Sequence, residues 1–156
     1  MAIAAARTKV WSAVSGGLNS IWLMDEADLT SFTLTGQAYS AYTTTGSFYK
    51  FEFAQDLAEF RETGSRENNS YQNTQELEFA FTGMSQTDRD HIEDIIDSST
   101  CGLVAIVKDS DGTKWVLGYS ENQLKERPLR LSSDTTLTGK GMTDLKGSTL
   151  VLSTTT

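Results

Sequence analysis

The chain has 156 residues, which suits one domain with its own core, and carries 21 acidic against 13 basic residues, a net charge of −8. This acidity argues against a general duplex-binding protein, because such proteins place Lys and Arg along the phosphates. One His, one Cys and one Pro leave little for catalysis. We therefore expect no enzyme, no metal and no cofactor.

Cys101 is the single cysteine, so no internal disulfide can form. It precedes the apolar run Leu103–Val107, and we expect a buried, inert thiol. No stretch approaches the ~20 apolar residues of a membrane span. Met1–Ala6 lacks the long apolar stretch of a secretory signal, so we expect none.

Residues 1–17 end in Ser15-Gly16-Gly17 and are interpreted as a flexible N-terminal arm, with residues 18–156 forming a single β-rich domain. Leu18–Met24 is predicted to be a strand with Ile21 and Leu23 on one face. A turn follows, and Leu29–Thr35 alternates as a second strand.

Ser47–Ala54 has strong strand patterning, with Tyr49, Phe51 and Phe53 on one face and Lys50 and Glu52 on the other. The polar stretch Thr63–Ser70 is predicted to be a loop. Tyr71–Phe81 resumes the period of two residues, with Leu77 and Phe79 opposite Glu76 and Glu78. Ala58–Glu62, just before the loop, could continue the strand Ser47–Ala54 or begin a second strand. The two acidic strands that flank the loop are predicted to form one long hairpin.

The only predicted helix covers residues 86–97, Gln86 to Asp97, with Ser85 as its N-cap and an apolar stripe at Ile92, Ile95 and Ile96. Gly102–Lys108 reads as a buried strand, which turns at Asp111-Gly112 and returns over Thr113–Tyr119. Three more short strands are expected at Leu129–Leu131, Thr135–Thr138 and Ser148–Leu152. The fold class is mainly β: an antiparallel β-sandwich or barrel-like domain with one α-helix.

Four patterns could suggest chemistry, and each has a simpler interpretation. Asp109-x-Asp111-Gly112 lacks the Glu and the flanking helices of a calcium loop and is read as a hairpin turn. Gly139-Lys140-Gly141 lacks the remainder of a phosphate loop and is read as a turn. His91 has no nucleophile to serve and is read as a surface residue.

Glu76 and Glu78 form the fourth pattern, because two carboxylates on one strand face could act as a glycosidase pair. A solvated or pore-facing strand explains them better. The aromatic residues are spread over alternating strands and do not cluster with bases, so we read them as core residues and not as a nucleic-acid stacking platform.

The paired acidic strands around a polar hairpin loop, the single helix from Gln86 to Asp97 and the closing strands resemble tail-tube proteins of tailed bacteriophages and of related contractile injection machines. The resemblance spans Leu18–Leu152 and is one of architecture. It implies a non-enzymatic virion structural protein, assembled in the host cytoplasm, whose subunits close into sixfold (hexameric) rings and stack into a tube.

The resemblance also implies roles for particular residues. Glu52, Glu76 and Glu78 would line an acidic lumen through which DNA passes without tight binding. The loop would reach the next ring, as could the N-terminal arm; its candidate residues are Gly64, Ser65, Arg66, Glu67, Asn68 and Asn69. The partners would be other copies of the chain and other virion proteins, with no membrane.

Two alternatives stay open. The chain could be a head decoration or connector protein, or another small virion protein. It could also be a β-sandwich ligand-binding module that uses Trp22 or Trp115 as a stacking platform for carbohydrate or protein.

Overall fold

The structure is a computed structural model that describes residues 16–36, 38–53, 57–120, 125–144 and 146–155. The predicted N-terminal arm lies outside these residues, except for Gly16 and Gly17. The elements follow in the order β1 (Leu18–Asp25), a 3₁₀ turn (Glu26–Asp28), β2 (Leu29–Thr35), β3 (Ala38–Thr44), β4 (Tyr49–Phe51), β5 (Ala58–Glu67), β6 (Ser70–Thr82), α1 (Gln86–Cys101), β7 (Leu103–Asp109), β8 (Lys114–Leu117), β9 (Tyr119–Ser120), β10 (Lys125–Glu126), β11 (Arg130–Leu137) and β12 (Gly147–Thr155).

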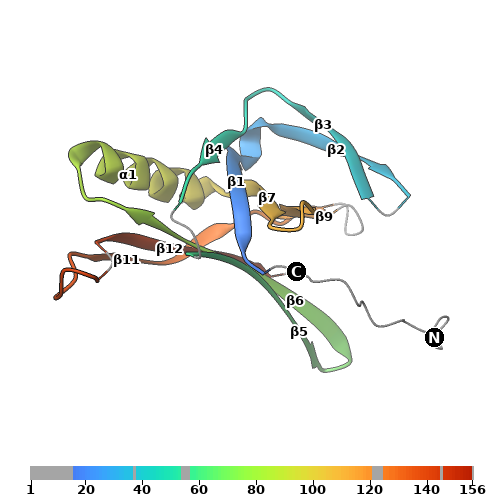
Figure 1. Ribbon diagram of the computed structural model, residues 1–156. Coiled ribbons are helices and arrows are strands. Elements are labelled where there is room, and N and C mark those ends of the chain that lie inside the picture. Colours follow the sequence, from blue (N-terminus) through green and yellow to red (C-terminus); the bar gives the residue numbers. More distant parts are fainter. Residues whose placement is uncertain (1–15, 37, 54–56, 121–124, 145, 156) are drawn as a thin grey trace.

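Two four-stranded antiparallel sheets dominate the fold (Figure 1). The β1–β7 sheet has the order β4-β1-β7-β8, and the β6–β12 sheet has the order β11-β12-β6-β5. Two smaller antiparallel pairs, β2–β3 and β9–β10, complete the described strands. The prediction of a mainly β, antiparallel fold with one α-helix is confirmed. Among the described residues neither large sheet closes on itself, so the fold resembles a sandwich more than a barrel.

The main core lies between the two large sheets and is closed at one end by α1. Its buried residues are Ile21, Leu23, Ala58, Leu77, Phe79, Ile92, Ile95, Leu103, Ala105, Val107, Leu117, Leu129, Leu150 and Leu152. Fully burying one large apolar side chain contributes about 1.5–3 kcal/mol. The alternation along β6 and β12, in which Leu77, Phe79, Leu150 and Leu152 are buried, therefore fixes which face of these two strands turns inward.

The β1–β7 sheet is buried on both faces, which explains the continuous apolar run in β7. Leu103, Ala105 and Val107 face the main core, whereas Val104 faces a second cluster with Met24, Leu29 and Phe32. The β2–β3 pair covers that second cluster. The predicted buried strand at Gly102–Lys108 is thus confirmed.

Leu29 and Phe32 share this second cluster although strict alternation puts them on opposite faces of β2. The β2–β3 register shifts between Leu29 and Ser31. A bulge inserts one extra residue and so reverses the facing of the residues beyond it. The sequence pattern alone did not show this bulge.

Helix α1 begins where the sequence predicts, because Ser85 and Asp88 form a reciprocal capping box. The predicted end at Asp97 is wrong, since the helix continues to Cys101. The hydroxyls of Ser99 and Thr100 donate to the Ile96 carbonyl, which satisfies them inside the helix. Gly102, with φ 113°, then ends it.

The strand predicted at Ser47–Ala54 is mostly wrong, because only Tyr49–Phe51 pairs, as β4 at the edge of the β1–β7 sheet. The aromatic alternation there reflects packing: Phe51 and Phe53 contact the main core from one side, and Tyr49 is exposed. The register places Phe51 opposite Ile21.

The loop predicted at Thr63–Ser70 is also wrong. Gly64, Ser65, Arg66 and Glu67 belong to β5, and the turn consists of Asn68 and Asn69 alone. Both Asn residues have positive φ, 48° and 64°, as a two-residue type I′ hairpin turn requires. The segment is polar because this part of the hairpin extends beyond the core, with both faces exposed to water. The predicted long hairpin itself is confirmed.

Near the C-terminus the number of strands differs from the prediction. The segments predicted at Leu129–Leu131 and Thr135–Thr138 are joined in one strand, β11, with a register shift between Leu131 and Ser133. The segment predicted at Ser148–Leu152 is the centre of β12, which pairs with β11 and β6.

Candidate functional site

Two of the three predicted lumen residues lie together on the β6–β12 sheet. Glu76 and Glu78 project from one face of β6, while Leu77 and Phe79 between and beyond them are fully buried on the other face. We call the face that carries the two Glu residues, turned away from the β1–β7 sheet, the outer face. It is the one polar side of a sheet whose other side forms the main core.

The β5–β6 register brings two more charged residues to the outer face. Glu59 lies opposite Glu78, and Arg61 lies opposite Glu76. Arg61 Nη1 is 3.3 Å from a Glu76 carboxylate oxygen, and Arg61 Nη2 is 3.4 Å from Glu59. One guanidinium therefore bridges two carboxylates, and among the described residues Glu78 makes no ion pair.

The rest of the outer face is mostly small and hydroxyl-bearing. By register it includes Thr63, Ser65, Ser70, Gln72, Thr74, Thr82, Thr149, Ser153, Thr155, Ser133 and Thr135, together with the apolar or small residues Ala80, Gly147, Val151 and Leu137. Its charged members are four acids, Glu59, Glu67, Glu76 and Glu78, and two bases, Arg61 and Arg130. The face is thus mostly hydrophilic and moderately acidic. Near the hairpin end, Glu67, Ser70, Gln72 and Thr155 line an open hollow of about 420 Å³.

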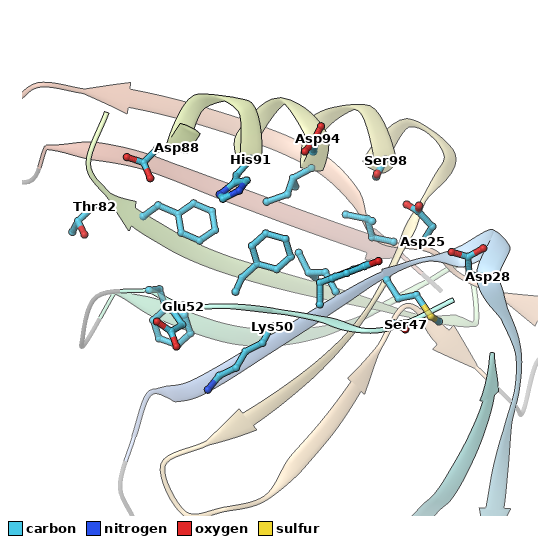
Figure 2. A pocket seen from close by; sticks show the side chains of 18 residues that line it. Asp25, Asp28, Ser47, Lys50, Glu52, Thr82, Asp88, His91, Asp94 and Ser98 are labelled. Carbon is cyan, nitrogen blue, oxygen red and sulfur yellow. The ribbon is translucent and has the colours of Figure 1, made fainter. Parts of the chain in front are cut away.

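Glu52, the third predicted lumen residue, lies elsewhere. It follows β4, which belongs to the β1–β7 sheet, and it lines a groove beside α1 (Figure 2). The expectation that Glu52 points together with Glu76 and Glu78 from adjoining strands is wrong, because β4 pairs with β1, whereas β6 pairs with β5 and β12.

The six predicted inter-ring residues lie at the end of the β5–β6 hairpin, which projects from the body of the molecule (Figure 1). Arg66 Nη2 is 3.5 Å from the Asn69 side-chain oxygen, across the turn. The Tyr71 ring lies against Gly64 on the facing strand, where a Cβ would collide with it. Tyr71 remains 72% exposed, so the hairpin end offers an unoccupied aromatic surface.

Both edges of the β6–β12 sheet are unpaired among the described residues. The sheet ends in β5 on one side and β11 on the other. Exposed edges of this length present free N–H and C=O groups that can pair with another chain. No proline lies within β5 or β11 to block such pairing.

The groove beside α1 has a volume of about 900 Å³. Its apolar floor consists of Leu23, Phe51, Phe53, Phe81, Ile95 and Leu103. Figure 2 shows α1 along one side, with Asp88, His91, Asp94 and Ser98 turned toward it, and Lys50 and Glu52 on the opposite side. The sequence reasoning missed this groove, since its walls come from segments far apart in the chain.

The groove rim is acidic. Asp25, Asp28, Glu52, Asp88 and Asp94 line it, against Lys50 and His91. The pKa of Asp88 is lowered, first by its hydrogen bond with the Ser85 hydroxyl and then by the Ser85 backbone N–H. Asp88 therefore serves as a helix cap as well as a rim residue.

The residues discounted for chemistry lie in ordinary structural settings. His91 is exposed on α1, as predicted. The Asp109 side chain accepts from the N–H groups of Asp111 and Thr113, which confirms the hairpin turn. In the turn around Gly139-Lys140-Gly141, Asp144 accepts from the N–H groups of Lys140 and Gly141, and these bonds lower its pKa, the Gly141 bond most.

The expectation of a buried Cys101 is wrong, because its thiol is free and exposed. The buried positions of α1 are Ile92, Ile95 and Ser99, and Cys101 at the last helical position lies off that stripe. Within the described part of the chain, no three His, Cys, Asp or Glu residues lie close enough to hold a metal ion.

Comparisons with family models, with curated proteins and with solved structures gave no match for this chain. Among the described residues, no helix combines the length and the apolar character needed to cross a bilayer.

Proposed function

We propose that this protein is a non-enzymatic structural subunit of a bacteriophage tail tube, which assembles with copies of itself into stacked rings. One observation carries the proposal: the β6–β12 sheet combines a polar, acidic outer face with two long edges, β5 and β11, that no other described strand pairs with. A monomeric domain normally covers or shortens such edges.

The strand directions suit a closed ring. All neighbours in the sheet are antiparallel, so β5 and β11 at its two edges run in opposite directions. Placing β5 of one copy beside β11 of the next therefore continues the antiparallel order. Such a head-to-tail contact uses two different surfaces, and it forms a ring if the rotation closes.

The outer face would then line the channel. Six copies with four strands each would give a ring of about 24 strands. This number exceeds the roughly 16–18 strands of porin barrels, which enclose water-filled channels. Four acids against two bases on each outer face would repel a polyanion weakly along the bore. This arrangement assigns the lining to Glu59, Glu67, Glu76 and Glu78, and leaves Glu52 out.

The projecting β5–β6 hairpin supplies a contact between rings in this proposal. Its end, Gly64 to Asn69, reaches beyond the sandwich, and Tyr71 offers apolar area there. The same hairpin includes part of the proposed lining, so a single element would join the channel wall to the next ring.

The test is assembly of the purified protein, followed by light scattering and negative-stain electron microscopy as its concentration rises. We expect rings or tubes of constant width. Substituting Pro for a β11 residue whose N–H points away from β12 should abolish rings while preserving the circular dichroism spectrum, because it removes only an edge donor. The matched control is Pro substitution of an exposed residue in the connection after β11, such as Thr143→Pro, which should still assemble. A monomer at high concentration would contradict the proposal.

A head decoration or connector protein would instead bind with the same β-rich surface to a preformed shell. The symmetry of the isolated assembly distinguishes this alternative from a stacked ring.

A ligand-binding module has one supporting observation: Trp115 is 45% exposed, and its ring centroid lies 6.0 Å from that of Phe60. Quenching of Trp115 fluorescence by oligosaccharides, lost in Trp115→Ala, would favour that alternative.

A further inference from the structure

We propose that the groove between α1 and β4 binds the N-terminal segment, residues 1–15, of a second copy of this chain. The proposal requires only that two copies meet, so it does not depend on the tube. It rests on three features of the groove: an exposed strand edge, an apolar floor and an acidic rim.

The strand edge comes from β4. This short strand pairs with β1 on one side and is the last strand of the β1–β7 sheet. Five consecutive residues, Tyr49 to Phe53, line the groove along this side. Side chains from both faces of this segment therefore border the groove, which means that the groove runs along its edge. An extended peptide can add to an exposed sheet edge of this kind.

The floor requires apolar side chains from the occupant. Phe51, Phe53 and Phe81 line the groove with their aromatic rings. The Phe51 and Phe81 ring centroids are 6.1 Å apart. Residues 1–15 supply Ile3, Val10, Trp11 and Val14. An aromatic anchor in an apolar groove is a common energetic centre of an interface.

The rim requires positive charge. Five carboxylates surround the groove, with Lys50 the one Lys or Arg among its lining residues. Residues 1–15 contain Arg7 and Lys9 and no acidic residue, in a chain whose net charge is −8. Charges of opposite sign across an interface favour encounter and register. Arg7 and Lys9 flank the apolar group Val10-Trp11, so one extended segment meets both requirements.

The chain direction favours a second copy over the same chain. The chain enters β1 beside the β7–β8 turn, where the Ser110 hydroxyl donates to the Gly16 carbonyl. A segment that folded back from Gly17 would run antiparallel to β1 and hence parallel to β4. Every described pair in this sheet is antiparallel. A segment from a neighbouring copy can enter the groove in the antiparallel direction.

Disulfide exchange between two separately purified chains tests the proposal, with Cys101→Ser in both. One chain carries Ser12→Cys, which leaves the proposed anchor Trp11 in place, and the other carries Ser98→Cys on the groove side of α1. The matched control replaces Ser98→Cys by Asp97→Cys, which lies on the same helix outside the groove lining. We expect heterodimer with Ser98→Cys to exceed the control about tenfold, because docking raises the effective concentration of the two thiols toward the millimolar range.

Equal yields with the two helix positions would overturn the assignment of the groove. A third chain that carries both Ser12→Cys and Ser98→Cys reports on the alternative within one molecule: intrachain closure in dilute solution, without heterodimer in the mixture, would overturn the second-copy assignment.

A charge swap gives an independent readout. Arg7→Glu with Lys9→Glu should weaken self-association about tenfold, since attraction at the rim becomes repulsion. Adding Glu52→Lys and Asp94→Lys to that chain should restore it, whereas adding Glu93→Lys and Asp97→Lys should not. Equal rescue by both pairs would contradict the proposal. Electron microscopy of the unmodified protein decides separately whether tubes form.

Discussion

Arg61 lies directly opposite Glu76 in the β5–β6 ladder, with its guanidinium 3.3 Å from the Glu76 carboxylate and 3.4 Å from Glu59. Arg61, the one base of this ladder that lies on the outer face, thus neutralises part of the charge contributed by its neighbours. The outer face carries more acids than bases, but Arg61 partly neutralises the carboxylates of Glu59 and Glu76 next to it. A channel that passes a polyanion benefits from weak repulsion without a strong barrier.

Replacing Arg61 by Gln should change the charge of the outer face more than the stability of the fold. Both side chains of the Arg61–Glu76 pair are substantially exposed, 53% and 40%. Exposed pairs contribute about 0.2–1 kcal/mol, so the free energy of unfolding in urea should fall by less than about 1 kcal/mol. A loss of several kcal/mol would show that the pair is structurally essential. Leu150→Ala, in the buried core, is the positive control, with an expected loss of about 2–5 kcal/mol.

Charge reversal on the outer face tests the lumen assignment. Glu76→Lys with Glu78→Lys should leave the circular dichroism spectrum and ring formation intact, since both side chains lie outside the main core. In the assembled tube the variant should retain short duplex DNA that the unmodified tube releases, with a steep salt dependence. Glu52→Lys with Asp28→Lys, at the groove, is the matched control and should not retain DNA. Equal retention by both would reject the lumen assignment.

Gly118 and Gly112 differ in why a side chain would destabilise the fold at each position. At Gly112 only the backbone angle opposes a side chain, whereas at Gly118 neighbouring atoms also occupy the space. Both have positive φ, 88° and 92°, but a Cβ at Gly118 would lie 2.8 Å from the Leu103 carbonyl oxygen, whereas nothing lies near one at Gly112. Gly112→Ala should cost about 1–2 kcal/mol of unfolding free energy, from φ alone. Gly118→Ala should cost clearly more, because backbone must move at the junction with Leu129. Equal losses in thermal or urea unfolding would contradict this difference.

The Asp88 cap should make the start of α1 sensitive to acid. Its folded pKa is lowered, so the stabilisation is complete above the ordinary Asp value of about 3.9 and is lost as the pH falls through the lowered folded pKa. Ser85→Ala removes the largest cause, and we expect the Asp88 pKa to rise toward its ordinary value. Titration of the carboxyl carbon by NMR measures this shift. Thr87→Ala, which removes a hydroxyl from the same turn, should leave the Asp88 pKa unchanged.

The β5–β6 hairpin shows how much one local motif could have predicted. Reading Asn68-Asn69 as a two-residue turn sets the register of the whole hairpin, and that register places Arg61 opposite Glu76 and Glu59 opposite Glu78. A polar stretch predicts a loop by hydropathy alone, although a strand that leaves the core has no need for apolar residues. The extent of β5 and β6 was therefore available from turn chemistry, and the hydropathy pattern concealed it.

The groove and the place of Glu52 could not be found in this way. Ser47–Ala54 has a convincing strand pattern, but pattern does not say which sheet a strand joins or how many of its residues pair. β4 joined β1, separated from it by more than twenty residues, and left Glu52 beside α1. The exposure of Cys101 depended likewise on how α1 packs.

The sequence by itself determined the local features: the capping box at Ser85, the Asp111-Gly112 turn and the alternation that buries Leu77 and Phe79 beside Glu76 and Glu78. These follow from interactions between near neighbours and from the period of a strand. Only the tertiary structure decided which strands share a sheet, which edges remain unpaired and where the acidic groove lies. Those outcomes depend on contacts between segments distant in the chain, and the burial of a common core, not any local preference, selects among them.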